Sequence, residues 1–133
     1  AAPALRPALG AALASLHRQV RRDAARFSTL DEARRHRLRR RIKRLRYATE
    51  LSAALWPAKA TAAFLRRLQR AQTALGDDQD ALMAMAQYRS LAASDPRAWF
   101  AVGWLTAHRA VLAGPCDRAL ARLARQPAPW RKG

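Results

Sequence analysis

Basic residues between positions 36 and 47 recur at a spacing that places them together on one side of a helix. That side carries His36, Arg39, Arg40, Lys43, Tyr47 and Glu50, with Arg46 at its edge. The opposite stripe carries Leu38, Ile42, Leu45 and Thr49. At the α-helical rise, the basic side extends roughly 15 Å, which is too long for one phosphate group. We therefore predict a linear anion-binding surface on a helix whose other side is buried.

The cations of this surface are suited to phosphate oxygens. Lys43 lies in the middle with Arg39 and Arg46 on either side, and all three would donate charge-assisted hydrogen bonds to a phosphate chain. Glu50, four residues after Arg46, is the one acid on this side, whereas a plain solvated surface would carry more. His36 is either an ordinary surface histidine or a contact that gains a proton with the ligand. We favour the contact and expect binding to tighten below neutral pH.

Other residues are candidates to widen the surface into a groove. The hydroxyl of Tyr47 either donates to a phosphate or covers the end of the bundle, and the sequence leaves both open. The remaining candidates are arginines of the first and third predicted helices: Arg18, Arg21, Arg22, Arg66, Arg67 and Arg70. The sequence does not determine which of these arginines lie beside the basic side.

Composition also favours a polyanionic ligand. The 133 residues contain 26 Lys plus Arg against 9 Asp plus Glu, giving a net charge of +17, and binding a polyanion would relieve the self-repulsion. Arginine greatly outnumbers lysine, either because its fork suits phosphate or because the genome favours Arg codons. Cys116 is alone, so no intrachain disulfide forms, which fits a reducing cytoplasm. No apolar run approaches 18 residues and no signal peptide is visible, so we expect no membrane partner.

Enzyme chemistry has little support in the sequence. There is no glycine-rich phosphate loop, and the three histidines lack metal-ligand spacing. Asp77 and Asp78 diverge by about 100° on a helix, so they do not form one Mg²⁺ site with Asp80. We therefore predict a binding protein without catalytic residues, metal or cofactor.

Apolar spacing predicts helices throughout, within a single domain over residues 1–133. We expect a first helix over about 3–27, and a second over about 30–56 that starts at a capping box, Thr29 to Glu32. A third should begin near Ala58. Gly76 is either its C-cap, before a new start at Asp77, or a glycine inside one long helix; we favour the long helix, with Met83 and Met85 in the core. We interpret the four tryptophans as core or packing residues: Trp56, Trp99, Trp104 and Trp130.

The last third of the chain should contain more than one helix. Asp95-Pro96 is a start signal, and the apolar stretch over 97–112 should be well buried. Gly114-Pro115 should end that helix, before a short basic helix over about 116–125 and a proline-broken tail over about 126–133. The sequence thus predicts an all-α, antiparallel four-helix-type bundle with additional C-terminal helices.

The chain resembles the CHAD family of histidine-containing α-helical domains. The resemblance is carried first by His36-x-x-Arg39-x-x-x-Lys43-Arg44-Leu45-Arg46-Tyr47, with Glu50 following. Further family-like segments are Gln72-x-x-Leu75-Gly76-x-x-x-Asp80, Gly103-Trp104-Leu105 and Pro129-Trp130-Arg131. The resemblance implies binding of inorganic polyphosphate by two helical bundles, related by a pseudo-twofold axis around a basic channel. The family often follows a triphosphatase-type domain and is associated with polyphosphate granules.

The basic motif occurs once in this chain, so the resemblance covers one bundle, similar to the C-terminal half of the family's domain. Either the N-terminal half was lost or removed, or two copies pair to rebuild the channel, so the expected protein partner is an N-terminal CHAD half or a second copy in a homodimer. The alternative function is sequence-nonspecific binding of nucleic acid. The basic side lacks interleaved aromatic residues other than Tyr47, and it lacks Asn or Gln for base readout, so nucleic acid is the second choice.

Overall fold

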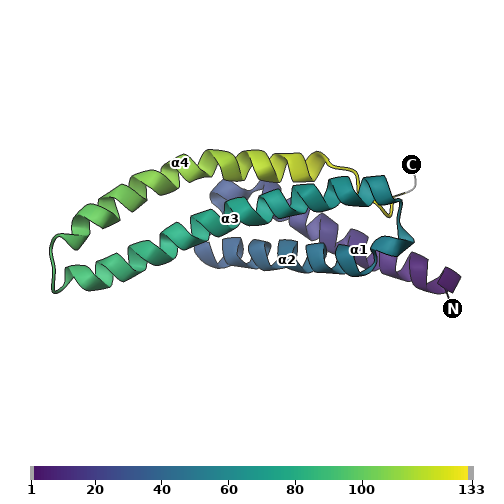
Figure 1. The fold of residues 1–133 in the computed structure, drawn as a ribbon, viewed down its shortest axis with the longest axis horizontal. Helices are drawn as coiled ribbons and strands as arrows, with labels where there is room; N and C mark the ends of the chain where they lie inside the picture. The colour runs from purple at the N-terminus through teal and green to yellow at the C-terminus, as the bar shows by residue number, and fades with distance from the viewer. Residues whose placement is uncertain (1, 132–133) are drawn as a thin grey trace.

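The computed structural model describes residues 2–131, with side chains from residue 4 onward. Four helices alternate in direction: α1 (Ala2–Ala25), α2 (Glu32–Leu51), α3 (Ala58–Ala92) and α4 (Ala98–Arg125) (Figure 1). Two 3-10 turns, η1 (Phe27–Thr29) and η2 (Ala53–Leu55), make the first two connections. The described residues contain no strand, which confirms the predicted all-α bundle.

One apolar core joins all four helices. α1 packs against α2 and α4, and α3 packs against α2 and along much of α4. Each helix contributes buried side chains at helical spacing: Leu13 and Val20 from α1, Leu38, Ile42 and Leu45 from α2, Phe64, Leu68 and Leu75 from α3, and Leu120 and Leu123 from α4. Burial of these stripes fixes which side of each helix faces solvent.

The start of α2 differs from the predicted capping box. The side chain of Asp31 accepts a hydrogen bond of 2.8 Å from the backbone N–H of Arg34, so Asp31 is the N-cap. Thr29 instead donates its hydroxyl to the carbonyl of Arg26 within the preceding 3-10 turn. The predicted cap at Thr29 is therefore wrong.

α2 also ends earlier than predicted, at Leu51 rather than near Trp56. Ser52 donates its hydroxyl to the carbonyl of Ala48, and the indole N–H of Trp56 donates to the Ser52 hydroxyl at 2.9 Å. Serine side chains compete in this way with the helical backbone. A separate 3-10 turn then brings Trp56 into the core.

α3 is one long helix, as predicted, and it runs through Gly76 from its start at Ala58. A Cβ at Gly76 would lie 3.8 Å from a terminal guanidinium nitrogen of Arg39 on α2, an ordinary contact distance, so the side chain of Arg39 packs over this position. Met85 is buried as expected, but Met83 is 55% exposed, so its predicted place in the core is wrong.

α4 corrects two predictions about the last third of the chain. The helix continues through Pro115 to Arg125, so there is no break at Gly114-Pro115 and no separate helix over 116–125. Pro115 removes a hydrogen bond to the carbonyl of Val111, but both residues lie on the exposed side, where solvent can replace it. No additional helix follows α4 in the described chain, which continues as a tail from Gln126.

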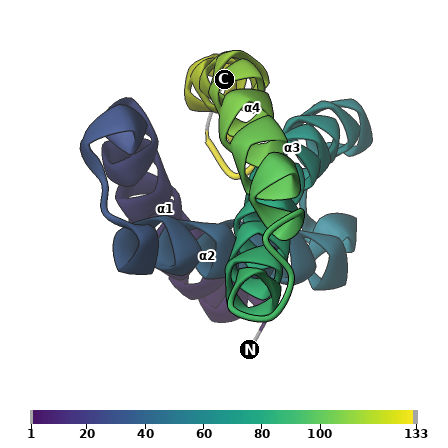
Figure 2. The same cartoon turned by 90° about the vertical axis from the view of Figure 1, so that its left-hand side faces the viewer.

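The stretch 97–112 is mostly exposed, contrary to its predicted burial. Trp99, Phe100 and Trp104 are 57%, 83% and 58% exposed, so two of the predicted packing tryptophans lie on the surface. The reason is architectural, because α3 and α4 extend beyond the ends of α1 and α2 (Figures 1 and 2). We call residues 82–107 the hairpin tip. No described helix is long and apolar enough to cross a membrane.

Candidate anion-binding surfaces

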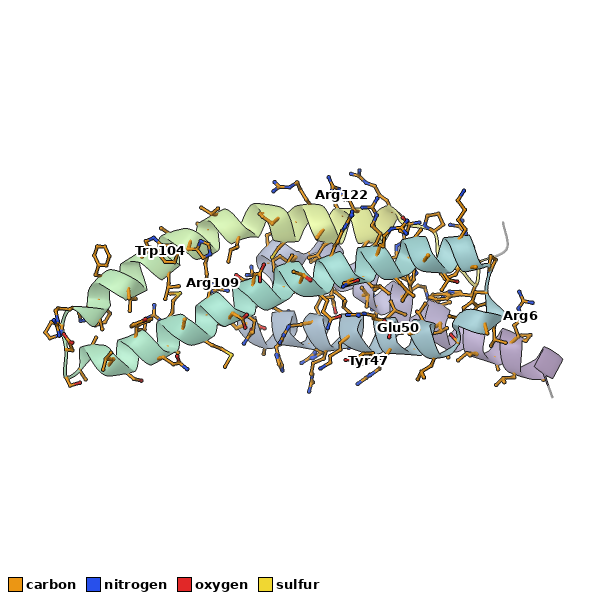
Figure 3. The ribbon with its side chains drawn as sticks, in the orientation of Figure 1. Arg6, Tyr47, Glu50, Trp104, Arg109 and Arg122 are labelled. Carbon is orange, nitrogen blue, oxygen red and sulfur yellow. The ribbon has the colours of Figure 1, made fainter. Side chains whose placement is uncertain are left out.

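The buried stripe of α2 places the predicted cations on its outer side. Leu38, Ile42 and Leu45 are fully buried, so the residues opposite them face solvent. We call six residues the basic face of α2: His36, Arg39, Arg40, Lys43, Arg46 and Tyr47. Among them His36, Arg40, Lys43 and Tyr47 are exposed, and Arg39 and Arg46 are half-buried. Figure 3 shows Tyr47 on the side of α2 that points away from α3.

Arg46 is held in place by two residues. Its Nε donates to Glu50 at 2.9 Å, one turn later on α2, and a terminal nitrogen donates to the side-chain oxygen of Gln72 on α3 at 3.0 Å. Gln72 belongs to the second family-like segment, and this hydrogen bond gives it a positioning role. Arg46 therefore has a fixed orientation and a partly compensated charge.

Arg39 lies against α3 and keeps a donor without a partner. Its terminal nitrogen lies over Gly76, and its Nε is buried without a hydrogen-bond partner in the described structure. A buried guanidinium donor without a partner is costly, and an acceptor placed beside Arg39 would offset that cost.

The exposed cations of the basic face have no acidic partner. Within residues 4–131, no carboxylate lies within 4.0 Å of Arg40 or Lys43. The Lys43 ammonium lies 5.9 Å from the centre of the Tyr47 ring, a spacing at which the ring weakly stabilises the cation. This face therefore carries uncompensated positive charge at Arg40 and Lys43, whereas the charge of Arg46 is partly compensated by Glu50.

A different group of arginines is paired with acids, although the buried Nε of Arg35 has no hydrogen-bond partner in the described structure. Arg109 on α4 donates to both carboxylate oxygens of the buried Asp78 on α3, at 3.0 and 3.1 Å, and to Glu32 on α2 at 2.9 Å (Figure 3). Arg35 lies 3.9 Å from Asp78 and 4.2 Å above the ring of Phe27. The hydrogen bonds to Asp78 hold the pKa of Arg109 above its ordinary value. We call Glu32, Arg35, Asp78 and Arg109 the Arg109 cluster; it ties three helices together and leaves little charge for a ligand.

The candidate arginines of α3 line hollows shared with α4 and not with α2. Arg67 and Arg70 line a groove of about 180 Å³ together with Arg118 and Arg122 of α4. Arg66 and Arg70 line an adjoining hollow of about 570 Å³, which also contains Asp77. These three arginines therefore form a second basic area instead of widening the basic face of α2.

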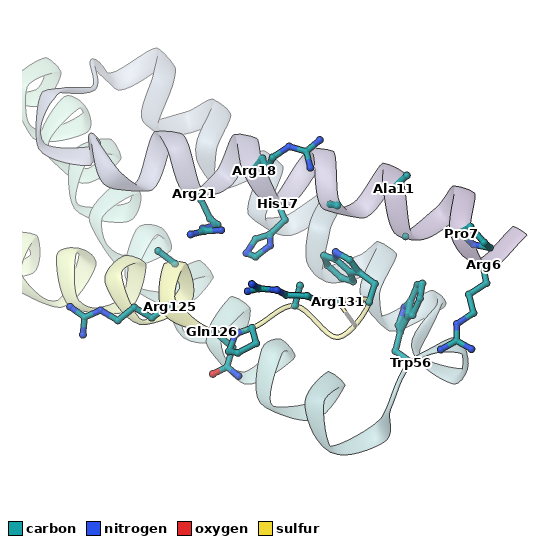
Figure 4. A pocket seen from close by; sticks show the side chains of 16 residues that line it. Arg6, Pro7, Ala11, His17, Arg18, Arg21, Trp56, Arg125, Gln126 and Arg131 are labelled. Carbon is teal, nitrogen blue, oxygen red and sulfur yellow. The ribbon is translucent and has the colours of Figure 1, made fainter. Parts of the chain in front are cut away.

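Two of the three candidate arginines of α1 lie around a third hollow. Arg18 and Arg21 line a cleft of about 1120 Å³ between α1, the end of α4 and the tail, and Arg22 is exposed on the same helix. Arg6, Arg125 and Arg131 line the same cleft, and no acidic residue does. Figure 4 shows His17 and Arg21 extending from α1 toward Arg131 of the tail.

His17 closes the inner wall of this cleft. It is buried against the edges of Phe64 and Trp130, with ring centres 5.1 and 6.0 Å away, and its Nε2 has no partner. Burial, reinforced by the charge of Arg21, lowers the pKa of His17 from 6.5 to about 4. His17 is therefore neutral at physiological pH, and the positive charge of the cleft comes from its arginines.

Sequence reasoning missed the cations of α4 and the tail that line these two hollows. They are Arg118, Arg122, Arg125 and Arg131, together with Arg6 of α1. The three-to-four-residue spacing from Arg118 to Arg125 was the available signal, but the break predicted at Pro115 separated this segment from α4. Apart from Trp130, no local pattern in the sequence indicated that the tail would pack back against α1.

The described residues do not group three potential metal ligands from His, Cys, Asp and Glu. Cys116 is buried and donates its thiol to the carbonyl of Ala74 at 3.3 Å. Burial raises the pKa of this thiol to about 11, so it stays protonated and is a structural residue.

These features define a small all-α protein with a basic, uncompensated helix surface. The family model for the CHAD domain matches residues 1–89, which include α1, the whole basic face of α2 and most of α3. The chain therefore belongs to the CHAD domain family. Comparisons with curated proteins and with solved structures found no match.

Proposed function

We propose that this protein binds inorganic polyphosphate, without catalysis, through the basic face of α2. The observation that carries the proposal is a row of cations along one helix that has exposed members without acidic partners. Membership of the CHAD family, which is associated with polyphosphate, supports this ligand over other polyanions. A linear anion with closely spaced charges is complementary to a linear row of cations, because both are extended and their charges are opposite.

The half-buried and the exposed residues of this face would have different roles in binding polyphosphate. Arg39 and Arg46 are half-buried and positioned by α3, so they would hold phosphate oxygens in a defined register. Arg40, Lys43 and His36 are exposed, so they would follow the chain with adaptable contacts. Release of counterions from the polymer would contribute much of the affinity and make it strongly salt-dependent. Such binding would place the protein on polyphosphate granules of the cytoplasm or serve an attached triphosphatase domain.

A charge-matched pair of variants tests this proposal. Arg40→Ala/Lys43→Ala removes two exposed cations from the basic face, and Arg26→Ala/Lys59→Ala removes two exposed cations that lie outside both the basic face and the hairpin tip. Binding of fluorescently labelled long-chain polyphosphate is measured by anisotropy between about 50 and 300 mM NaCl. We expect the first pair to weaken binding about tenfold or more and to flatten the slope of log Kd against log salt. The control pair should have a much smaller effect.

Equal losses in both pairs would mean that binding follows net charge alone, which would overturn the assignment to α2. A competition titration separates the two ligand classes. Unlabelled polyphosphate should displace labelled single- or double-stranded DNA at matched phosphate concentration. If DNA displaces polyphosphate instead, the protein is a nucleic-acid-binding bundle.

A further inference from the structure

The hairpin tip has an apolar surface that the rest of the chain does not cover. Phe100 and Trp104 of α4 are both more than half exposed, and Tyr88 of α3 is exposed beside them; Trp99 and Leu91 are also exposed within the tip. Figure 3 shows the position of Trp104 on α4 within the tip. A shallow hollow of about 510 Å³ lies between the two helices, lined by alanines and larger apolar residues: Ala84, Tyr88, Phe100, Ala101, Trp104 and Leu105. Clustered exposure of large aromatic side chains on a small protein marks a contact surface.

The tip also carries little charge. Residues 82–107 contain three charged side chains, Arg89, Asp95 and Arg97, for a net charge of +1 against +17 for the whole chain. Asp95 and Arg97 form an ion pair of 2.9 Å, so the charges at the turn of the hairpin neutralise each other. Two copies of this protein would repel each other strongly through their bodies and only weakly through their tips.

The architecture shows what kind of partner the tip lacks. Over the body of the molecule, α1 and α2 cover the inner sides of α3 and α4 and complete a four-helix bundle (Figures 1 and 2). Beyond the ends of α1 and α2, the hairpin continues as two helices alone. A second antiparallel helix pair of the same length would bury its apolar side chains in the same way.

We propose that the hairpin tip binds the tip of a second copy of this chain, so that two hairpins form an intermolecular four-helix bundle. A twofold pairing of this kind is self-complementary, since the same aromatic residues contribute from both sides. The inference rests on the tip alone and does not require the proposed function. An anionic ligand would favour the basic body over this nearly neutral surface, so a polyanion is a poor occupant of the tip.

Pairing through the tips would have a consequence for polyphosphate binding. The two bodies would extend away from the shared tip, and each would carry its own basic face. A chain long enough to reach both faces would bind with higher apparent affinity than a short one. This consequence, unlike the pairing itself, rests on the proposed function.

Sedimentation velocity and light scattering of the full chain, without polyphosphate, test the pairing. We expect a species of twice 14.8 kDa, that is 29.6 kDa, at about 50 µM protein in 0.5 M NaCl, where salt screens the repulsion between bodies. Phe100→Glu should weaken the dimer at least tenfold, because each copy would place a charge in the contact. The side chain is 83% exposed, so the monomer should fold normally by circular dichroism. Leu51→Glu is the matched control, since Leu51 is 90% exposed but lies at the end of α2.

Three outcomes would overturn the proposal: a monomer at about 100 µM, equal weakening by Phe100→Glu and Leu51→Glu, or large species without a fixed mass. A monomer that binds neutral phosphatidylcholine vesicles in a Phe100-dependent way would assign the tip to a lipid surface instead. The affinity of Phe100→Glu for short-chain polyphosphate distinguishes the failure of one proposal from the failure of the other. If one basic face is enough to bind a short chain, this affinity should equal that of the native protein, whether or not the dimer forms.

Discussion

The Arg109 cluster and the basic face of α2 place arginines in opposite settings within one small protein. In the cluster, Arg109 is held by Asp78 and Glu32, and the three side chains fasten α4 to α3 and α2. On the basic face, Arg40 and Lys43 are exposed and have no carboxylate within 4.0 Å in the described structure. The acids of this chain are few, and their placement separates arginines that stabilise the fold from arginines that are free for a ligand.

This comparison predicts opposite effects on stability when each setting is disturbed. Removing Asp78 from the cluster leaves two half-buried arginines with fewer acidic partners, whereas removing a cation from the basic face relieves repulsion. The basic cleft between α1 and the tail is an intermediate case, because its arginines surround a neutral, buried histidine. The three settings can be ranked by the size of the change in the free energy of unfolding.

The largest change should come from Asp78→Ala. This substitution leaves Arg109 with Glu32 alone and leaves Arg35 without its carboxylate, in a region where the side chains of Arg109 and Asp78 are 19% and 11% exposed. We expect a loss of about 3 kcal/mol in the free energy of unfolding by urea, because breaking a buried ion pair exposes the full cost of the remaining charge. Asp80→Ala, two residues later on the exposed side of α3, should cost less than about 0.5 kcal/mol. Similar losses for both would mean that the Arg109 cluster is not a structural unit.

His17 should produce a pH-dependent change of similar size. Its pKa is lowered from 6.5 to about 4 in the folded protein, so the unfolded chain binds a proton at a higher pH than the folded chain does. Its contribution to stability is complete above pH 6.5 and is lost as the pH falls from 6.5 to 4, by about 3 kcal/mol at the acid end. Urea unfolding measured from pH 7 to pH 4 should therefore show a steeper loss in the native chain than in His17→Leu.

The surface histidine provides the control for this experiment. His36→Leu changes an exposed side chain on α2 and should keep the steep pH dependence of the native protein. If His17→Leu and the native chain have parallel profiles, the imidazole does not stay neutral in the fold. Charged groups near His17 are arginines of α1, α4 and the tail, so no neighbouring carboxylate lines the cleft to reverse the sign.

Local spacing was sufficient to predict much of the fold. The stripe of Leu38, Ile42 and Leu45 identified the buried side of α2, and the structure buries all three. Gly76 inside α3 was also anticipated, because the apolar spacing continues on both sides of it. Such features depend on residues within a few turns of one another, so the sequence displays them directly.

Features that depend on distant segments were not predictable in this way. The stretch from Trp99 to Trp104 was expected in the core because apolar side chains are usually buried, but its exposure depends on where α1 and α2 end. Likewise, Arg66, Arg67 and Arg70 were candidates to widen the basic face of α2, yet only packing decides that they border α4 instead. The effect of Pro115 was overestimated, since an exposed proline can be accommodated in a helix that packs well on its other side.

The smallest predicted change is also the sharpest test of the comparison, because it involves two neighbouring arginines. Arg40→Ala removes an exposed cation that has like charges three and four residues away on α2, so we expect the free energy of unfolding to rise by about 0.5 kcal/mol at low salt. Arg41→Ala removes the same charge but breaks an ion pair of 2.7 Å with Asp23 on α1, and it should lower stability by about 0.5 to 1 kcal/mol. Both variants lower the net charge by one, so a general relief of repulsion would shift them equally. Urea unfolding at about 20 mM and 500 mM NaCl should show opposite signs at low salt and a smaller difference at high salt. Equal shifts would mean that net charge, and not the placement of the acids, decides which arginines stabilise the fold.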